Sequence, residues 1–162
     1  MQVRAESPGD LPAVGRVLEA AFGQPDEAEL VERLRADGDA ALSLVAVADG
    51  AVAGHVLFSP MSAPFPALAL APVAVLPERQ GRGIGSALIR EGLARAEARG
   101  WRGVFVLGEP AYYRRFGFDA EAARGFASPY AGPFLMVLPL GGPLPAQSGT
   151  IGHAPGFARM GG

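Results

Sequence analysis

The chain has 162 residues, of which 49% are apolar and 19% charged, and its formal net charge at pH 7 is −2. This length and composition suit one folded domain with a sizeable core, which excludes a disordered regulator and a collagen-like fibre. The absence of cysteine excludes disulfides and a cysteine nucleophile, and the small negative charge argues against a nucleic-acid partner, because such partners usually require a basic surplus.

The sequence also carries no targeting or membrane-spanning pattern. Met1–Glu6 lacks the apolar core of a signal peptide. The richest apolar stretch, 63–76, is interrupted by Pro64, Pro66 and Pro72, so it does not suit a membrane-spanning helix. We therefore expect a cytoplasmic protein with no membrane partner.

The first quarter of the chain predicts two helices. Apolar residues recur at helical spacing over 8–22, where Ser7 can cap the helix and Asp10 stands at the acidic position of a capping box. A second, shorter helix is predicted over 26–37, because glycine follows its last apolar turn.

The pattern then changes to that of strands. Strands are predicted over 42–48 and 51–59, joined by a tight turn at Asp49-Gly50. A third strand is predicted over 68–76. Pro72 lies inside it and cannot donate a ladder hydrogen bond, so we expect an irregularity there.

The second half alternates helices and strands and ends in a segment rich in glycine and proline. The expected elements are a helix at 84–99, a strand at 101–107, a short helix at 110–116, a strand at 134–140 and a final short strand near 150–157. No repeat and no linker interrupts this order. We therefore expect a single α/β domain over 1–162, with a mixed sheet and helices on both faces.

Three glycines stand at alternate positions between the strand 68–76 and the helix 84–99, namely Gly81, Gly83 and Gly85. Glycine allows a tight turn and lets a ligand approach the main chain closely. The unpaired N–H groups and the dipole at a helix N-terminus attract anions. This segment therefore predicts a binding site for a phosphate or a pyrophosphate.

Three known phosphate loops compete for this segment. A P-loop needs a lysine, and the chain has none. A dinucleotide fingerprint needs glycine where Ser86 stands and an acid at the end of a second strand, whereas Glu97 falls inside a helix. The pattern Gln/Arg-x-x-Gly-x-Gly/Ala fits residues 80–85 at every position.

This last pattern resembles the acetyl-CoA pyrophosphate loop of the GNAT superfamily of N-acetyltransferases. The segment 108–118 resembles the Tyr-x-x-x-Gly-Phe ending of the same superfamily, and it follows the loop after one helix and one strand. The resemblance covers 1–140 well and 141–162 loosely. It implies a GNAT-like domain whose central sheet is splayed next to the cofactor loop.

The resemblance further implies acetyl-CoA as co-substrate, no metal, and direct attack of a primary amine on the thioester in a ternary complex. Backbone N–H groups of Val73, Ala74 and Val75 would bind the pantetheine arm and polarise the thioester carbonyl, and Tyr112 would line the pantetheine channel or pack beside it. The residues that would bind the pyrophosphate are Gln80, Gly81, Arg82, Gly83, Ile84, Gly85 and Ser86.

Tyr113 takes the general-acid position of the superfamily, where a phenol would protonate the departing CoA thiolate; a packing role is the alternative. No carboxylate lies on the strand 68–76, so we expect water to remove the amine proton, with Glu109 as the nearby acid able to assist. His55 is a further candidate base, on the face opposite Val52, Val56 and Phe58, although a lone strand histidine is more often structural. His153 carries no signal.

The arginines at 114 and 115 are typical of a solvated helix face. The acceptor is expected to be the amine of a small molecule or a peptide, and a homodimer stays open. The competing function is a non-catalytic acyl-CoA-binding sensor, because the third strand lacks a base.

Overall fold

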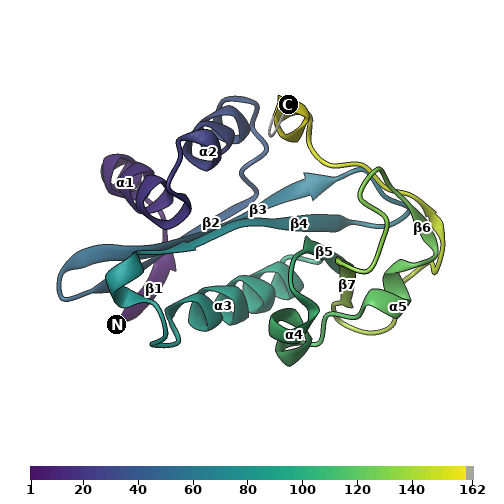
Figure 1. Cartoon of the computed structure of the whole chain (residues 1–162). Coiled ribbons are helices and arrows are strands. Elements are labelled where there is room, and N and C mark those ends of the chain that lie inside the picture. The colour runs from purple at the N-terminus through teal and green to yellow at the C-terminus, as the bar shows by residue number, and fades with distance from the viewer. Residues whose placement is uncertain (160–162) are drawn as a thin grey trace.

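A computed structural model describes residues 1–159 of the chain, whose centre is a six-stranded sheet (Figure 1). In spatial order its strands are β1 (Gln2–Ala5), β2 (Leu42–Ala48), β3 (Ala51–Met61), β4 (Ala67–Val75), β5 (Gly103–Leu107) and β7 (Leu135–Pro139). Only β4 and β5 run parallel, and the other neighbouring pairs are antiparallel. The expected mixed sheet is confirmed.

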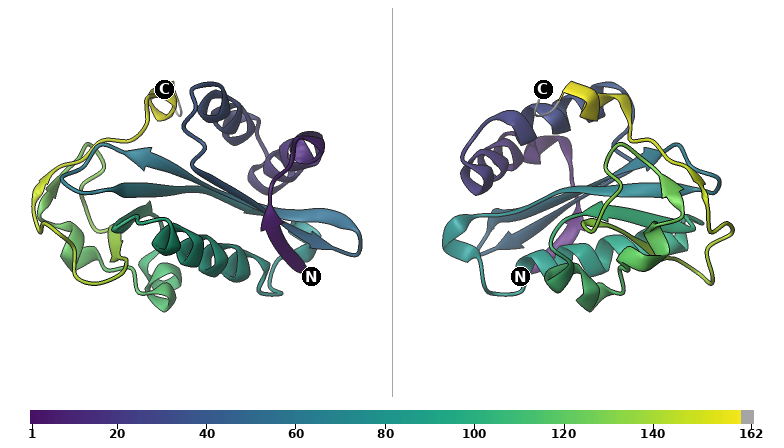
Figure 2. Two further views of the ribbon diagram at one scale, coloured as in Figure 1. Left: turned by 180° about the vertical axis from the view of Figure 1, so that it is seen from behind. Right: turned by 45° about the vertical axis from the view of Figure 1, so that its right-hand side comes forward.

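Helices cover both faces of this sheet (Figures 1 and 2). On one face lie α1 (Leu11–Phe22) and α2 (Asp26–Ala36); on the other lie α3 (Ile84–Ala98) and α4 (Pro110–Tyr113). Each face has its own apolar core, since alternate residues of a strand point to opposite sides. Within residues 1–159, no helix combines the length and apolar character needed to cross a membrane.

The N-terminal segment contains the predicted capping box and also a short strand, β1, that the sequence did not predict. The capping box forms between Ser7 and Asp10, on a 3-10 turn (Pro8–Asp10) that leads into α1. The Asp10 carboxylate also binds Arg4 through two hydrogen bonds, of 2.7 and 3.0 Å, and these contacts hold the pKa of Asp10 well below its usual value. Arg4 belongs to β1, a short edge strand without apolar alternation.

The C-terminal part differs from the prediction. The strand β8 covers only Gly149–Thr150 and pairs with β6 (Phe126–Ala127), and a 3-10 helix (Pro155–Arg159) follows it. The predicted final short strand is present only at its start, and its extension to 157 is wrong because Pro155, which lacks an N–H, begins a helical turn there. The short helix α5 (Ala120–Ala123) was not predicted either.

The sheet opens between its two parallel strands. The β4–β5 ladder covers only Ala67–Ala69 on β4, paired with residues 103–105 on β5. Beyond Ala69, β4 continues to Val75 with β3 as its only partner within the described residues. The β3–β4 register shifts opposite Pro72, which confirms the expected irregularity. Within the described residues, the edge of β4 that faces β5 is therefore unpaired from Leu70 to Val75, directly before the predicted ligand loop.

Candidate active site

A cavity of about 330 Å³ lies where β4 ends and α3 begins. Its lining consists of Val75, Arg79, Gln80, Gly81, Gly83, Ile84, Gly85, Ser86, Tyr112 and Arg115. Most residues expected at the cofactor are among them. Val73, Ala74 and Arg82 do not line this cavity, and the Ala74 side chain is buried in the core beneath α1 and α2.

The glycine loop has the backbone conformation that its sequence predicts. Gly81 and Gly83 have φ angles of 78° and 82°, in the left-handed region that favours glycine. The Gln80 side-chain amide donates a 3.2 Å hydrogen bond to the Val75 carbonyl and so fastens the loop to β4. Gly83 is the N-cap of α3, so the next three N–H groups have no partner within the helix and belong to residues that line the cavity.

Two arginines add positive charge to this cavity. Arg79 forms a 2.8 Å ion pair with Asp49, which lowers the pKa of that carboxyl. The Arg115 guanidinium lies over the Tyr112 ring, 4.4 Å from its centroid, and donates a 2.9 Å hydrogen bond to the Tyr112 carbonyl. Arg115 is exposed, as expected for a solvated helix face, and it also lines the cavity because it lies one helical turn after Tyr112.

Tyr113 lies next to the cavity without lining it. Its ring contacts Tyr112 edge-on, with centroids 5.0 Å apart, and Phe118 at 5.9 Å. It also occupies the space that a side chain at Gly108 would need, which explains a glycine directly after β5. Burial, with a smaller effect of Tyr112, raises the pKa of Tyr113 to about 12, so the phenol holds its proton at neutral pH.

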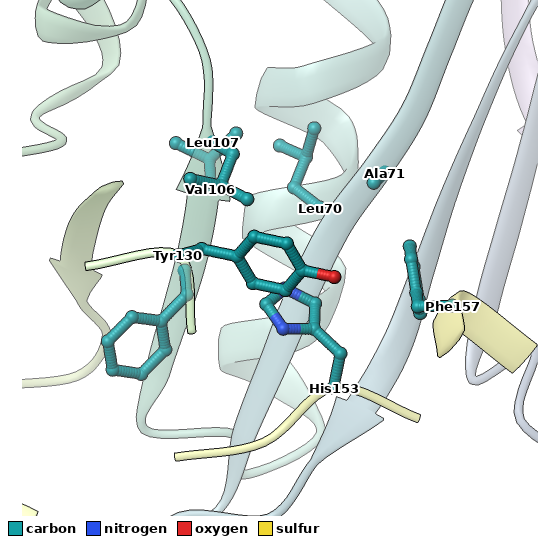
Figure 3. A pocket seen from close by; sticks show the side chains of 8 residues that line it. Leu70, Ala71, Val106, Leu107, Tyr130, His153 and Phe157 are labelled. Atoms are coloured by element: carbon teal, nitrogen blue, oxygen red, sulfur yellow. The ribbon is translucent and has the colours of Figure 1, made fainter. Parts of the chain in front are cut away.

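A second cavity, of about 230 Å³, lies where β4 and β5 diverge. It is lined by Leu70, Ala71, Phe105, Val106, Leu107, Tyr130, His153 and Phe157. Figure 3 shows the rings of Tyr130, His153 and Phe157 beside Leu70 and Ala71 in the middle of β4 and Val106 and Leu107 at the end of β5. No spacing in the sequence relates these three rings to β4, so sequence reasoning missed them. Only the tertiary path of the C-terminal tail (140–159) brings His153 and Phe157 to Tyr130, which precedes β7.

The family model described as "Acetyltransferase (GNAT) family" matches residues 11–118. The chain belongs to this family. It is 41% identical over 133 residues to the uncharacterized N-acetyltransferase YjhQ of Escherichia coli (strain K12), covering 76% of this chain and 73% of that protein. It is 40% identical over 126 residues to the uncharacterized N-acetyltransferase YhbS of the same strain, covering 75% of each chain.

Solved GNAT structures resemble the whole chain. A crystal structure of Escherichia coli YhbS in complex with CoA has a TM-score of 0.92 and 34% identity, covering 99% of this chain and 93% of the other. A GNAT acetyltransferase from Brucella melitensis in complex with acetyl-CoA has a TM-score of 0.82 and 40% identity, covering 96% and 97%. The predicted GNAT fold and acetyltransferase class are confirmed, and the ligands of both relatives agree with the predicted co-substrate.

Glu109 lies in the short connection between β5 and α4. It is the exposed N-cap residue of α4, and its backbone carbonyl accepts hydrogen bonds from the N–H groups of Tyr112 and Tyr113, at 3.0 and 3.1 Å. Its carboxylate lines neither cavity. The structure thus provides a role for the Glu109 backbone in starting α4, and the predicted assistance to catalysis stays a prediction.

His55 is a buried core residue that lines neither cavity, so the hypothesis that it acts as a base is wrong. Its side chain is fully buried, with Nε2 2.8 Å from the Ser43 hydroxyl and 3.7 Å from the Glu6 carboxylate. Burial, with the nearby charge of Arg35, lowers the pKa of His55 to about 3. The β2–β3 register shifts near Ala53, so Val52 packs into the core beneath α1 and α2 and not on the face opposite His55.

Metal ligands are not gathered anywhere in residues 1–159, which contain no group of three or more His, Asp or Glu side chains arranged to hold an ion. The first cavity is lined by the glycine loop and two arginines, and the second by apolar residues and four rings.

Proposed function

We propose that the protein transfers the acetyl group of acetyl-CoA to a primary amine by direct attack in a ternary complex. One observation carries this proposal: the glycine loop, the first turn of α3 and two arginines converge on one cavity at the free edge of β4. Backbone N–H groups at a helix N-terminus bind phosphates well. The CoA and acetyl-CoA found in the two related crystal structures support the same ligand here.

In this proposal the pyrophosphate binds the N–H groups of residues 80–86, with Arg79 and Arg115 nearby. Arg82 lies on the same loop and contributes through its backbone. The pantetheine arm lies along Val73–Val75, where β4 has no ladder partner on its β5 side within the described residues. Peptide groups that lack a strand partner are free to pair with the amides of pantetheine. The thioester then reaches the gap between the strands.

The proposed reaction needs one group to stabilise the oxyanion and one to protonate the leaving group. Attack by the amine places negative charge on the thioester oxygen, which a fixed backbone N–H of β4 would stabilise. As the C–S bond breaks, the Tyr113 phenol gives its proton to the sulfur. Burial raises the pKa of Tyr113 to about 12, so the phenol enters the reaction protonated, while the same shift makes it a weaker acid toward the thiolate.

Calorimetry with acetyl-CoA, CoA and NADPH, followed by a panel of amines assayed by free-thiol release, tests the proposal. We expect binding of both CoA species, no comparable binding of the nicotinamide, and thiol release that depends on an amine. Tighter binding of NADPH would contradict the cofactor assignment. Tight acetyl-CoA binding without thiol release for any amine at any pH would replace the enzyme by an acyl-CoA sensor.

The exposure of Glu109 leads to a specific prediction. Glu109→Gln should lower kcat by tenfold at most, because its carboxylate is exposed to solvent and water can still remove the amine proton. Steady-state rates across the neutral pH range measure this change, and Glu121→Gln on the exposed helix α5 serves as the control. A fall of several orders of magnitude would instead identify Glu109 as the direct base.

A further inference from the structure

The second cavity passes through the gap in the sheet. Leu70 and Val106 pack in the core beneath α3, whereas Phe105 packs on the opposite face of the sheet in a third apolar cluster, with Phe65 and Phe126. Strand residues from both faces therefore line one space, which requires the strands to part there. A ligand in this cavity would approach the edge of β4 from the side opposite α3, and this is the edge along which we place the thioester.

The lining is small, aromatic and almost uncharged. It includes no Asp, Glu or Arg, and its ionisable side chains are His153 and Tyr130. Four of its eight residues carry rings. Its volume, about 230 Å³, falls below the roughly 300–1,000 Å³ typical of pockets for drug-sized ligands. A compact, largely apolar molecule fits such a space, and a folded protein substrate does not.

His153 is held in this cavity by the path of the tail. The preceding residue, Gly152, exchanges two backbone hydrogen bonds of 2.9 Å with Ser62 at the end of β3. The imidazole lies edge-on between Tyr130 and Phe157, with ring centroids 5.1 and 5.2 Å away (Figure 3). Its orientation is therefore fixed by packing as well as by the backbone.

The imidazole also has unused hydrogen-bonding capacity. Its Nδ1 is buried and has no hydrogen-bond partner among residues 1–159, an arrangement that costs about 1–3 kcal/mol unless a ligand supplies a partner. Burial lowers the pKa of His153, so the ring is neutral at pH 7 and can accept a proton. Of the elements around it, β4 and β5 present apolar residues, and Tyr130 is the titratable group that it contacts.

We propose that this cavity is the acceptor site, that it takes a small primary amine carried on an aromatic ring, and that His153 accepts the proton of that amine. The inference rests on the proposed acetyl transfer and names its substrate class and base. Amines with a second charge, such as polyamines or free amino acids, would leave that charge without an ionic partner in the lining. Aromatic rings gain edge-on contacts with the rings already present.

The proton balance is complete with the groups named. The neutral amine nitrogen forms the new C–N bond, and the C–S bond breaks with its electron pair on sulfur. The nitrogen gives one proton to the imidazole nitrogen that carries the lone pair, and the sulfur takes the Tyr113 proton. Water then removes the proton from the imidazolium and returns one to the phenolate, so the products are an N-acetyl amine and CoA.

Substrate preference is the first part of the test. Thiol release is measured with aniline and phenethylamine against spermidine and lysine, at saturating acetyl-CoA. We expect kcat/KM to be at least tenfold higher for the aromatic amines. Phe157→Ala should raise the KM for these amines with little change in kcat and none in acetyl-CoA affinity, because it widens the cavity. Equal or higher kcat/KM for spermidine or lysine would overturn the inference while leaving the acetyltransferase assignment intact.

The base is tested with His153→Gln and His153→Ala, with aniline as acceptor because an aromatic amine is a much weaker base than an alkyl amine and is neutral around pH 7. The wild-type rate should fall at acid pH, below the ordinary imidazole value of about 6.5, because burial lowers the pKa of His153. His153→Gln should lose this acid limb and lower kcat roughly 10²-fold, and imidazole should partly restore His153→Ala. Unchanged acetyl-CoA affinity shows that the variants are folded. The role of His153 would be overturned if both variants reacted within threefold of the wild-type rate. It would also be overturned if imidazole failed to restore His153→Ala and His153→Gln kept the acid limb of the wild-type pH profile.

Discussion

Tyr113→Phe should lower kcat by roughly 10²–10⁴-fold, the usual range for loss of a positioned proton donor, and leave the dissociation constant for CoA within a few fold of wild type. The expectation follows from the position of Tyr113, which packs against Gly108 after β5 and against Tyr112 at the cofactor cavity. Phenylalanine keeps these ring contacts and removes only the hydroxyl. Single-turnover rates together with calorimetry separate chemistry from binding.

Tyr112→Phe is the matched control for this experiment. The Tyr112 hydroxyl lies beside Gly85 at the start of α3, so its loss should weaken CoA binding modestly and affect turnover much less. If Tyr113→Phe stays within threefold of wild type, the phenol is structural and the proton reaches the thiolate from another source. A large loss of CoA affinity in Tyr113→Phe would show instead that the substitution disturbs the cavity.

The pH dependence should agree with the same role. The active form of Tyr113 is the neutral phenol, and burial raises the pKa of Tyr113 to about 12. A group with this pKa remains about 99% protonated at pH 10. Deprotonation of Tyr113 should therefore not reduce kcat/KM below about pH 11, whereas an unshifted phenol, with a pKa of about 10, would begin to reduce it near pH 9.

The parts of the site that the sequence could predict are those made by neighbours in the chain. The glycine loop and the first turn of α3 follow one another directly, so spacing alone identifies the ligand they suit. The Ser7–Asp10 capping box and the Asp49-Gly50 turn are equally local. In each case the interacting groups lie within a few residues, where backbone preferences determine the geometry.

The parts that the sequence could not predict depend on long-range contacts. His153 stands in a tail without apolar periodicity, and its position depends on the bridge between Gly152 and Ser62, far apart in the chain. The face of Val52 depends on a register shift in the β2–β3 ladder, which alternation counted along one strand does not reveal. Edge strand β1 lacks an apolar pattern, and none of its four residues is buried, whereas four of the seven residues of its neighbour β2 are.

The glycine loop itself offers a prediction about binding that does not involve catalysis. Gly85 lies in the first turn of α3, and a Cβ added there would be 3.3 Å from the Tyr112 hydroxyl and 3.7 Å from a methyl group of Val75. Its backbone does not have a positive φ, unlike Gly81 and Gly83. A side chain at this position is therefore compatible with the helix but enters the cofactor cavity.

Gly85→Val should raise the dissociation constant for CoA roughly 100-fold, which corresponds to about 2.7 kcal/mol, while the melting temperature of the free protein stays close to wild type. Calorimetry and thermal unfolding with and without CoA measure both quantities, and the stabilisation by CoA should largely disappear. Gly15→Ala is the control, because Gly15 lies in α1 on the opposite face and a Cβ there meets nothing within 4 Å. That variant should bind CoA normally and unfold slightly later, since alanine favours a helix over glycine by roughly 1 kcal/mol. A Gly85→Val protein that binds CoA within threefold of wild type would place the pyrophosphate outside this cavity.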